Sequence, residues 1–238
     1  MVSRETYRPQ HYFDLNGVWF STFFLEVDQV WGLLAPDRKE SWIRGNFSSS
    51  TKKLRREGSL VLETYTNKFT VEAGSYVVGD EIELISGALI EAGAWVTGPT
   101  ILGEGTIVRH GAYIRGGVIT GKNALIGHAS EVKSSIFLNN AKAPHFAYVG
   151  DSIVGNSVNL GAGTKVSNLK ITHDEVILRI GDENIPSGLR KFGAIIGDNC
   201  ETGCNSVLNP GVLLGKGCLV YPAVAVQKNY YKPKSVIR

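Results

Sequence analysis

The stretch Ile126 to Asn168 reads IGHASEVKSSIFLNNAKAPHFAYVGDSIVGNSVNLGAGTKVSN and advances in units of six residues. An aliphatic residue begins each unit, small residues or glycine follow, and two further positions lead to the next aliphatic residue. Five residues of types that carry chemistry stand among these small and aliphatic side chains: Glu131, Lys133, His145, Tyr148 and Asn159. The fold of the repeat decides whether they meet.

The six-residue period extends beyond this stretch in both directions. The first positions of the units are almost all Ile, Val or Leu, and they run from Val78 to Val166 and again from Ile196 to Val226. Two units, which begin at Val132 and Val149, are one residue short. A fixed period of this kind indicates a repeat architecture.

A six-residue period fits neither a helix of 3.6 residues per turn nor simple strand alternation. It is typical of a parallel β-helix, in which three short strands and three tight corners make one triangular coil. Residues one coil apart then stack at about 4.8 Å. Glycine suits corners with unusual backbone angles, and the chain has 28 glycines.

Counting coils with the two short units included places the polar residues in vertical columns. The first column, at the third position of one face of the prism, holds His110, His128, His145 and Ala162. The second, at the last position of that same face, holds Tyr113, Glu131 and Tyr148. The third lies just around the following corner and holds Arg115 and Lys133. Asn159 falls at a different corner, so it reaches this cluster only from a neighbouring subunit.

The predicted cluster has a chemical logic. A histidine accepts a proton from an amine or hydroxyl near neutral pH, and the carboxylate of Glu131 can orient that amine. Arg115 and Lys133 form a pocket for a phosphate or carboxylate. The small Ala162 above His145 leaves space for an acyl thioester.

At these residues the chain resembles a known family of hexapeptide-repeat acyltransferases. The pattern AxHxxYVGDxxxGxxVNLGAGTxxxN, from Ala143 to Asn168, is similar to the acetyltransferase half of the bifunctional glucosamine-1-phosphate N-acetyltransferase / N-acetylglucosamine-1-phosphate uridylyltransferase family. The resemblance covers roughly Val96 to Val226. It implies an all-β solenoid, a left-handed parallel β-helix, assembled as a homotrimer.

The resemblance also implies roles for single residues. His145 would be the catalytic base, and Tyr148 a second catalytic residue that helps to hold the amino sugar. The remaining acceptor site, for an amino-sugar phosphate such as glucosamine-1-phosphate, would consist of Arg115, Glu131, Lys133, Asn159 and Lys191. The co-substrate acetyl-CoA would lie along Ala162, Asn168, Cys204 and Pro222. The product would enter UDP-N-acetylglucosamine biosynthesis.

Three features depart from the commonest bacterial members of that family. The segment from Leu169 to Leu189 is longer, and Cys204 stands in place of a serine. No glycine-rich LxxGxGTRM-like loop occurs near the N-terminus. We therefore do not carry over the uridylyltransferase activity, which a separate nucleotidyltransferase partner would supply.

Charge and composition limit the partners and the cellular location that we expect. The net charge of +3 is too small to indicate a nucleic-acid partner. No stretch is apolar enough to predict a membrane span, and MVSRETYRPQ is no signal peptide. The cysteines Cys200, Cys204 and Cys218 are odd in number and lack metal-site spacing, which favours a reducing, cytoplasmic location.

The chain outside the repeat divides into two parts. Residues 1–70 lack the period, and apolar residues at helical spacing between Phe20 and Leu34 predict a small helical cap or a remnant domain, ended by Pro36. Such a cap would cover an open end of the solenoid. The acyltransferase domain spans residues 71–238, and residues 167–194 interrupt it as an arm of two short strands. The basic, aromatic tail KNYYKPKSVIR is either a contact for the CoA nucleotide or a plain extension.

Other functions remain open at this point. The column of three histidines suggests zinc, but adjacent-coil stacking gives poor tetrahedral geometry, so we expect no metal. The acyl acceptor could instead be another sugar or a nucleotide-linked sugar. A third hypothesis is a non-catalytic module that binds sugar phosphates.

Overall fold

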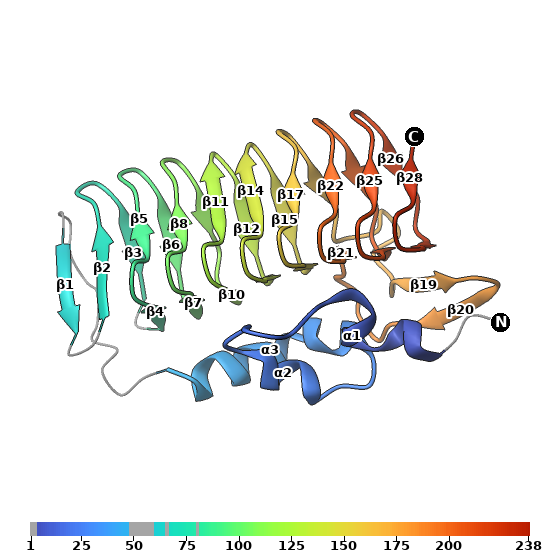
Figure 1. Ribbon diagram of the computed structural model, residues 1–238, viewed down its shortest axis with the longest axis horizontal. Coiled ribbons are helices and arrows are strands. Elements are labelled where there is room, and N and C mark those ends of the chain that lie inside the picture. Colours follow the sequence, from blue (N-terminus) through green and yellow to red (C-terminus); the bar gives the residue numbers. More distant parts are fainter. Residues whose placement is uncertain (1–3, 48–59, 65–66, 80) are drawn as a thin grey trace.

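The structure is a computed structural model, and it describes residues 4–47, 60–64, 67–79 and 81–238. A solenoid of three parallel sheets makes up most of it, and a layer of short helices lies along one side (Figure 1). The left-handed parallel β-helix expected from the period and the resemblance is confirmed.

Sheet A has ten strands and contains the columns of His145 and Asn159. In spatial order they are β1 (Leu60–Thr64), β2 (Asn67–Val71), β5 (Leu89–Ile90), β8 (Ile107–Val108), β11 (Leu125–His128), β14 (Lys142–His145), β17 (Asn159–Leu160), β22 (Glu201–Thr202), β25 (Leu219–Val220) and β28 (Val236–Ile237). β1 and β2 form an antiparallel hairpin, and β2 pairs in parallel with β5. Sheet A thus begins before residue 71, inside the segment for which we expected only helices.

Sheet B follows sheet A around the next corner of the prism and has eight strands. They are β3 (Tyr76–Val78), β6 (Trp95–Thr97), β9 (Tyr113–Ile114), β12 (Glu131–Lys133), β15 (Tyr148–Gly150), β18 (Lys165–Val166), β23 (Val207–Leu208) and β26 (Ala225–Val226).

Sheet C closes the triangle and also has eight strands. They are β4 (Ile82–Leu84), β7 (Thr100–Leu102), β10 (Val118–Thr120), β13 (Ile136–Phe137), β16 (Ile153–Val154), β21 (Ala194–Ile196), β24 (Val212–Leu214) and β27 (Tyr230–Tyr231).

Successive coils stack in register, including the two short units. Ile90 pairs with Val108, eighteen residues later, whereas Ile126 pairs with Ala143, seventeen residues later. One aliphatic side chain from each strand points inward, and these side chains form a continuous core along the solenoid. The shortened coils keep this inward row intact, so the residues on the outer faces also stay aligned.

The helical layer packs against the outer face of sheet C. It consists of two 3₁₀ helices and three α-helices: η1 (Arg4–Tyr7), α1 (Pro9–Tyr12), α2 (Ser21–Leu25), η2 (Val30–Leu34) and α3 (Pro36–Gly45). Its aromatic side chains share a second core with a row of outward-facing aliphatic residues on sheet C, namely Ile101, Ile119, Ile136, Ile153, Ile195 and Leu213.

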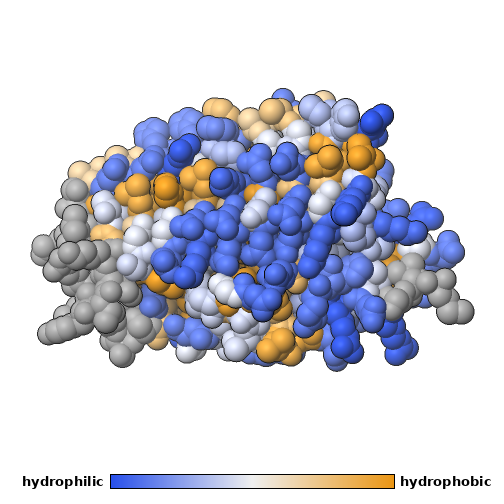
Figure 2. Space-filling model, viewed as in Figure 1, coloured by the Kyte–Doolittle hydropathy of each residue, from blue (hydrophilic) through white to orange (hydrophobic). Residues whose placement is uncertain are grey.

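The place of this layer differs from the expected cap over a solenoid end. Sheet C is apolar on both faces, and its outer row needs as much covering as its inner one. The helices therefore lie along the side of the prism (Figure 1). The outer surface of the layer is mainly hydrophilic in the same view, with hydrophobic residues in small patches (Figure 2). Across the described residues, none of the helices has the length and apolar character needed to cross a membrane.

An antiparallel hairpin, β19 (Ile177–Ile180) and β20 (Glu183–Pro186), leaves the solenoid between β18 and β21. An antiparallel bridge between Leu169 and Lys191 closes its base. Leu178 and Ile180 are buried in the second core, beside the helical layer. The Tyr7 hydroxyl donates a hydrogen bond to Glu183 at 2.9 Å. The arm is thus packed against the helices over part of its length.

The second core supplies a test of the helical layer. Phe24 is fully buried there, while the next residue, Leu25, is 68% exposed. Phe24→Ala should lower the free energy of unfolding by about 3–5 kcal/mol, the usual effect of removing a buried aromatic ring. Leu25→Ala should change it by less than about 0.5 kcal/mol. Urea denaturation followed by circular dichroism measures both, and equal effects would contradict the packing described here.

Candidate functional site

The corner between sheets A and B holds the histidine column. β14 ends at His145 and β15 begins at Tyr148, and Phe146 turns the chain with a φ of 52°. In the register, His128 pairs with His145, and Glu131 pairs with Tyr148. The members of the first two predicted columns are therefore confirmed, but their placement on one face was wrong, because a corner separates them: the histidines end sheet A, and Tyr113, Glu131 and Tyr148 begin sheet B.

The histidine column continues towards the C-terminus through small or exposed residues. The Gly163 amide donates to the His145 carbonyl at 3.0 Å, which places Ala162 one coil above His145. Equivalent bonds, from Asn205 to Ala162 and from Ala223 to Cys204, align Cys204 and Pro222 with the same column. Farther towards the C-terminus on sheet A, β22 and β25 line an open hollow that also includes Tyr221 and Pro222. Ala162, Cys204 and Pro222 thus share one path that starts at His145.

The rings of His110 and His128, the two histidines of the column before His145, lie within hydrogen-bond distance of backbone carbonyls. The rings of His110 and His128 stack at 5.5 Å between centroids with an interplanar angle of 7°. Their Nδ1 atoms lie 2.7 Å from the Ala92 carbonyl and 2.9 Å from the His110 carbonyl. Within the described part of the chain, no group of three or more His, Cys, Asp or Glu side chains is arranged to hold a metal ion.

Arg115 and Glu131 form an ion pair on the outer face of sheet B. Arg115 Nη1 donates to Glu131 Oε1 at 2.6 Å, and the Arg115 guanidinium also lies 5.9 Å from the centre of the Tyr113 ring. Both charged side chains are partly exposed. The Glu131 carboxylate is therefore held beside Tyr148 and is still open to a ligand.

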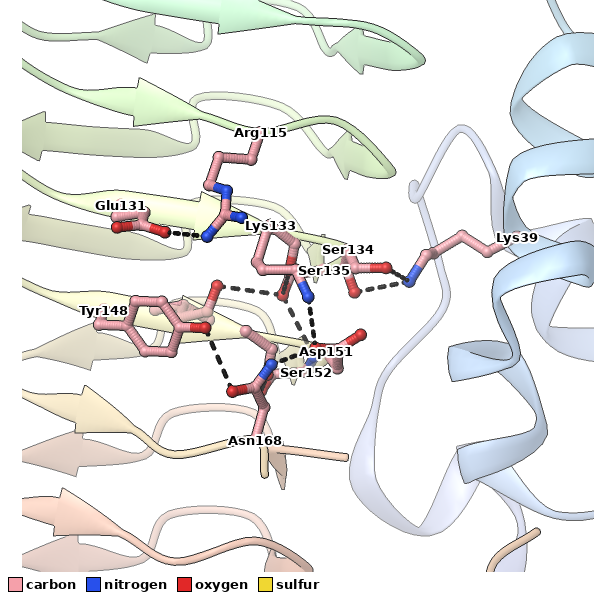
Figure 3. Close-up of polar contacts among 12 residues, drawn as sticks. Lys39, Arg115, Glu131, Lys133, Ser134, Ser135, Tyr148, Asp151, Ser152 and Asn168 are labelled. Carbon is pink, nitrogen blue, oxygen red and sulfur yellow. Dashed lines mark hydrogen bonds and ion pairs between the residues drawn. The ribbon is translucent and has the colours of Figure 1, made fainter. Parts of the chain in front are cut away.

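A chain of polar contacts links Lys133 to Tyr148 through a buried carboxylate (Figure 3). Lys133 Nζ lies 3.0 Å from Asp151 Oδ2, and the Asn168 amide donates to the same oxygen. The Tyr148 hydroxyl in turn donates to Asn168 Oδ1 at 3.2 Å. Burial, followed by the charge of Glu131, raises the pKa of Tyr148, so its hydroxyl keeps its proton and remains a donor.

This arrangement needs a glycine at position 150. A Cβ there would come within 2.8 Å of the Tyr148 hydroxyl and 2.7 Å of the Asn168 amide nitrogen. The missing side chain lets the tyrosine ring lie along its own strand and reach Asn168. Tyr148 is thereby joined to the Lys133 end of sheet B.

Two of the expected site residues lie apart from this edge. Asn159 begins β17, where it pairs with Lys142 at the opposite end of sheet A from His145. Lys191 re-enters the solenoid beside Asn168, because the amide of the next residue, Phe192, donates to the Asn168 carbonyl at 2.9 Å. The Lys191 side chain is exposed. One chain thus places His145 at the corner between sheets A and B, Glu131 and Tyr148 at the adjoining end of sheet B, and Arg115 and Lys133 at the far end of sheet B. Lys191 enters near that far end, and Asn159 lies elsewhere.

Asn168 does not lie with the residues expected to bind acetyl-CoA. Its side chain is 9% exposed, and Tyr148 and Asp151 occupy its oxygen and its amide. It sits at the corner between sheets B and C, whereas Ala162, Cys204 and Pro222 lie at the corner between A and B. The structure therefore separates Asn168 from the three other residues that the resemblance assigns to acetyl-CoA.

Sequence reasoning overlooked three charged residues around the site. Asp151 is the buried partner of Lys133. It directly follows Val-Gly in the motif, and this position could have indicated that it belongs to the site. Lys165 pairs with Tyr148 in register and donates to the carbonyls of Phe146 and Gly163. Lys39 reaches the site from α3, and nothing in the repeat pattern could have indicated it.

Comparisons with known proteins match part of the chain. The family model described as the GMPPB C-terminal domain matches residues 96–185. A bifunctional sugar-1-phosphate nucleotidylyltransferase/acetyltransferase of Sulfurisphaera tokodaii is 40% identical over 97 residues, which are 41% of this chain and 24% of that protein. The bifunctional protein GlmU of Methanococcus vannielii is 40% identical over 111 residues, 44% of this chain and 27% of that protein.

These relatives confirm the resemblance to the bifunctional acetyltransferases. The chain spans about a quarter of the length of the curated relatives it matches. Among solved structures, an Arabidopsis UDP-N-acetylglucosamine acyltransferase matches with a TM-score of 0.41 and 15% identity, over 69% of this chain and 67% of that one. A likeness so distant carries no argument about function.

Lys39 should make the free energy of unfolding depend on pH. Burial, partly offset by the charge of Asp151, lowers the pKa of Lys39 from 10.5 to about 8. The unfolded chain then binds more protons than the folded one between these values, so this group makes stability rise with pH there. The free energy of unfolding of the wild type, minus that of Lys39→Met, should increase by about 2 kcal/mol from pH 8 to pH 10.

Urea denaturation of both proteins at each pH measures this difference. Taking the difference removes the contributions of groups common to both proteins, such as Cys218, whose pKa is lowered to about 7. A difference that stays constant, or falls, from pH 8 to pH 10 would show that Lys39 keeps an ordinary pKa in the folded protein.

Proposed function

We propose that the protein is an N-acetyltransferase that moves an acetyl group from acetyl-CoA to the amine of an amino-sugar phosphate, with glucosamine-1-phosphate as the preferred acceptor. The observation that supports this most strongly is the stacking at one edge of the prism. His145 lies directly below Ala162, and the polar groups of Tyr148, Glu131, Arg115 and Lys133 begin on the adjoining face. The family model matches residues 96–185, which include this edge, and the relative in Sulfurisphaera tokodaii is named as an acetyltransferase.

His145 acts as the general base in this proposal. Its side chain is exposed at the end of β14, where an acceptor can reach it. The protonated amine first loses one proton to solvent. The amine nitrogen then attacks the thioester carbonyl carbon, the new C–N bond forms and the C–S bond breaks. The second proton of the amine passes to His145, which gives it to the departing CoA thiolate. Holding both reactants in one groove supplies much of the acceleration.

The acceptor binds on sheet B and at the corner beyond it. Arg115, Lys133 and Lys191 hold the phosphate, since Arg115 and Lys133 lie one coil apart at the far end of sheet B and Lys191 enters the solenoid next to Asn168. Glu131 and Tyr148 hold the sugar, and Glu131 attracts the protonated amine before it is deprotonated. The Tyr148 hydroxyl, which keeps its proton, or a backbone amide near Ala162 donates a hydrogen bond to the oxyanion.

The donor lies along the path from His145 through Ala162 and Cys204 to Pro222. These residues are small or project little from the wall, and the hollow beside Tyr221 and Pro222 continues the path. The thioester is placed at Ala162 and the nucleotide end of CoA towards the C-terminal coils. Both substrates are molecules of the cytoplasm, where we place the reaction.

The active assembly in this proposal is a homotrimer with sites between subunits. Asn159 is assigned to the sugar by the resemblance, yet it begins β17, away from the end of sheet A that holds His145. A neighbouring copy brings its own Asn159 to the site in a cyclic assembly. The helical layer covers sheet C, which leaves sheets A and B for contacts between copies.

The catalytic assignment is tested by comparing histidines of one column. His145→Ala should lower kcat for acetyl transfer to glucosamine-1-phosphate by about 10²–10⁴-fold, because it removes the general base. His128→Ala is the matched control and should have far less effect, since its ring is tied to the backbone one coil below. Release of the CoA thiol, followed with a panel of sugar phosphates and nucleotide sugars, measures the rates.

Each outcome of this experiment separates the hypotheses. If thiol release depends on another acceptor, that acceptor is the substrate in place of glucosamine-1-phosphate. Full activity of His145→Ala would show that the base lies elsewhere. Thiol release no higher than background with every acceptor would leave a sugar-phosphate-binding module and sink the enzyme proposal.

The assembly is tested by subunit complementation. We expect light scattering to give about three times the chain mass of 25.8 kDa. Coexpressed His145→Ala and Asn159→Ala chains should recover activity that neither variant has alone, because some shared sites then receive both intact residues. An active monomer, or a mixture no more active than its parents, would place the whole site within one chain.

A further inference from the structure

Lys39 is a fully buried lysine that connects the helical layer to the site. It extends from α3 towards the corner between sheets B and C, where Ser134 and Asp151 lie (Figure 3). Its Nζ donates to the carbonyl of Ser134 at 2.5 Å and to the Ser134 hydroxyl at 2.9 Å. Ser134 directly follows Lys133, and its φ of 50° turns the chain at this corner. Lys39 thus lies behind Lys133, on the side away from solvent.

A buried ammonium group is costly unless a negative charge compensates it. The charged groups that act on Lys39 are Asp151 and Lys133 at the solenoid corner and Glu40 on its own helix. The attraction of Asp151 outweighs the repulsion of Lys133. Asp151 therefore forms a direct ion pair with Lys133, and its charge also acts on Lys39, whose Nζ is bonded to Ser134, the residue after Lys133.

Lys133 is committed to that ion pair as the structure stands. Its side chain is 17% exposed and the Asp151 side chain 3% exposed, with 3.0 Å between Nζ and Oδ2. A phosphate bound by Lys133 competes with Asp151 for the same ammonium. Drawing Lys133 away would leave a buried carboxylate without a cation, which is strongly unfavourable.

The charges around the corner show how this difficulty is avoided. Arg115 and Glu131 neutralise each other. Lys133 and Asp151 also cancel, so Lys39 adds a buried positive charge to this corner, beside the exposed Lys191. We propose that Lys39 is a positioning residue that serves as a second countercharge of Asp151 and so frees Lys133 to bind the anionic group of the acceptor. This inference rests on the proposed function, in which Lys133 binds a sugar phosphate.

Binding of glucosamine-1-phosphate, measured by calorimetry, tests the inference directly. Lys39→Gln removes the charge but keeps a donor for Ser134, and Lys39→Met removes both. Each variant should weaken binding by about ten- to a hundredfold, the loss of one charge-assisted hydrogen bond. Binding of CoA should not change. Lys122→Met is the control for loss of a surface cation, because Lys122 pairs with Glu104 in the neighbouring coil, outside the site. It should bind the sugar phosphate like the wild type.

A second substitution distinguishes the countercharge from a purely structural role. Asp151→Asn combined with Lys39→Gln removes the carboxylate that retains Lys133, so the pair should recover most of the lost affinity. Circular dichroism and urea denaturation establish that each variant is folded.

Three results would overturn the inference. Unchanged affinity in both Lys39 variants would show that Lys133 does not need the second cation. Weak binding by Lys39→Met alone would reduce Lys39 to a hydrogen-bond donor for Ser134. A double variant as weak as Lys39→Gln would mean that Asp151 is not what holds Lys133. If the wild type itself does not bind the sugar phosphate, the proposed function fails, and this inference with it.

Discussion

In-register stacking of the coils is the constraint on which the rest of the structure depends. Each outward side chain lies about 4.8 Å from its counterpart in the next coil, so the spacing of residues along the sequence becomes their position on the prism. His128 pairs with His145, and Glu131 with Tyr148, because the unit that begins at Val132 is one residue short and the inward row still closes. The register therefore brings residues from separate coils together along sheet B and its corner with sheet A without any loop designed to hold them.

This constraint explains which parts of the site could be predicted. Residues that belong to the period, such as His145, Glu131, Tyr148, Arg115 and Lys133, fall into columns that counting alone defines. Residues at the corners are harder, because a corner side chain turns with the backbone. Asn168 illustrates this, since its motif position suggested the donor path while its side chain contacts Tyr148 and Asp151.

Contacts between the repeat and the rest of the chain could not be predicted from the period. Lys39 and Ser134 are 95 residues apart, and only the packing of α3 against sheet C brings them together. That packing follows from the apolar outer row of sheet C, which includes Ile119, Ile136 and Ile153. The sequence showed apolar residues at helical spacing between Phe20 and Leu34, but it did not show that they would cover the side of the prism instead of its end. A layer that resembles a simple covering thereby places a buried charge beside the corner that holds Lys133 and Asp151.

A crystal structure with CoA and glucosamine-1-phosphate bound tests the central claim most directly, because the claim is geometric. The account predicts the sugar amine within hydrogen-bond distance of His145, and CoA along Ala162, Cys204 and Pro222. It also predicts the phosphate on Lys133, with that lysine moved off Asp151 while Lys39 keeps its place. A sugar phosphate bound at another face of the prism, or CoA bound away from the His145 column, would contradict the account.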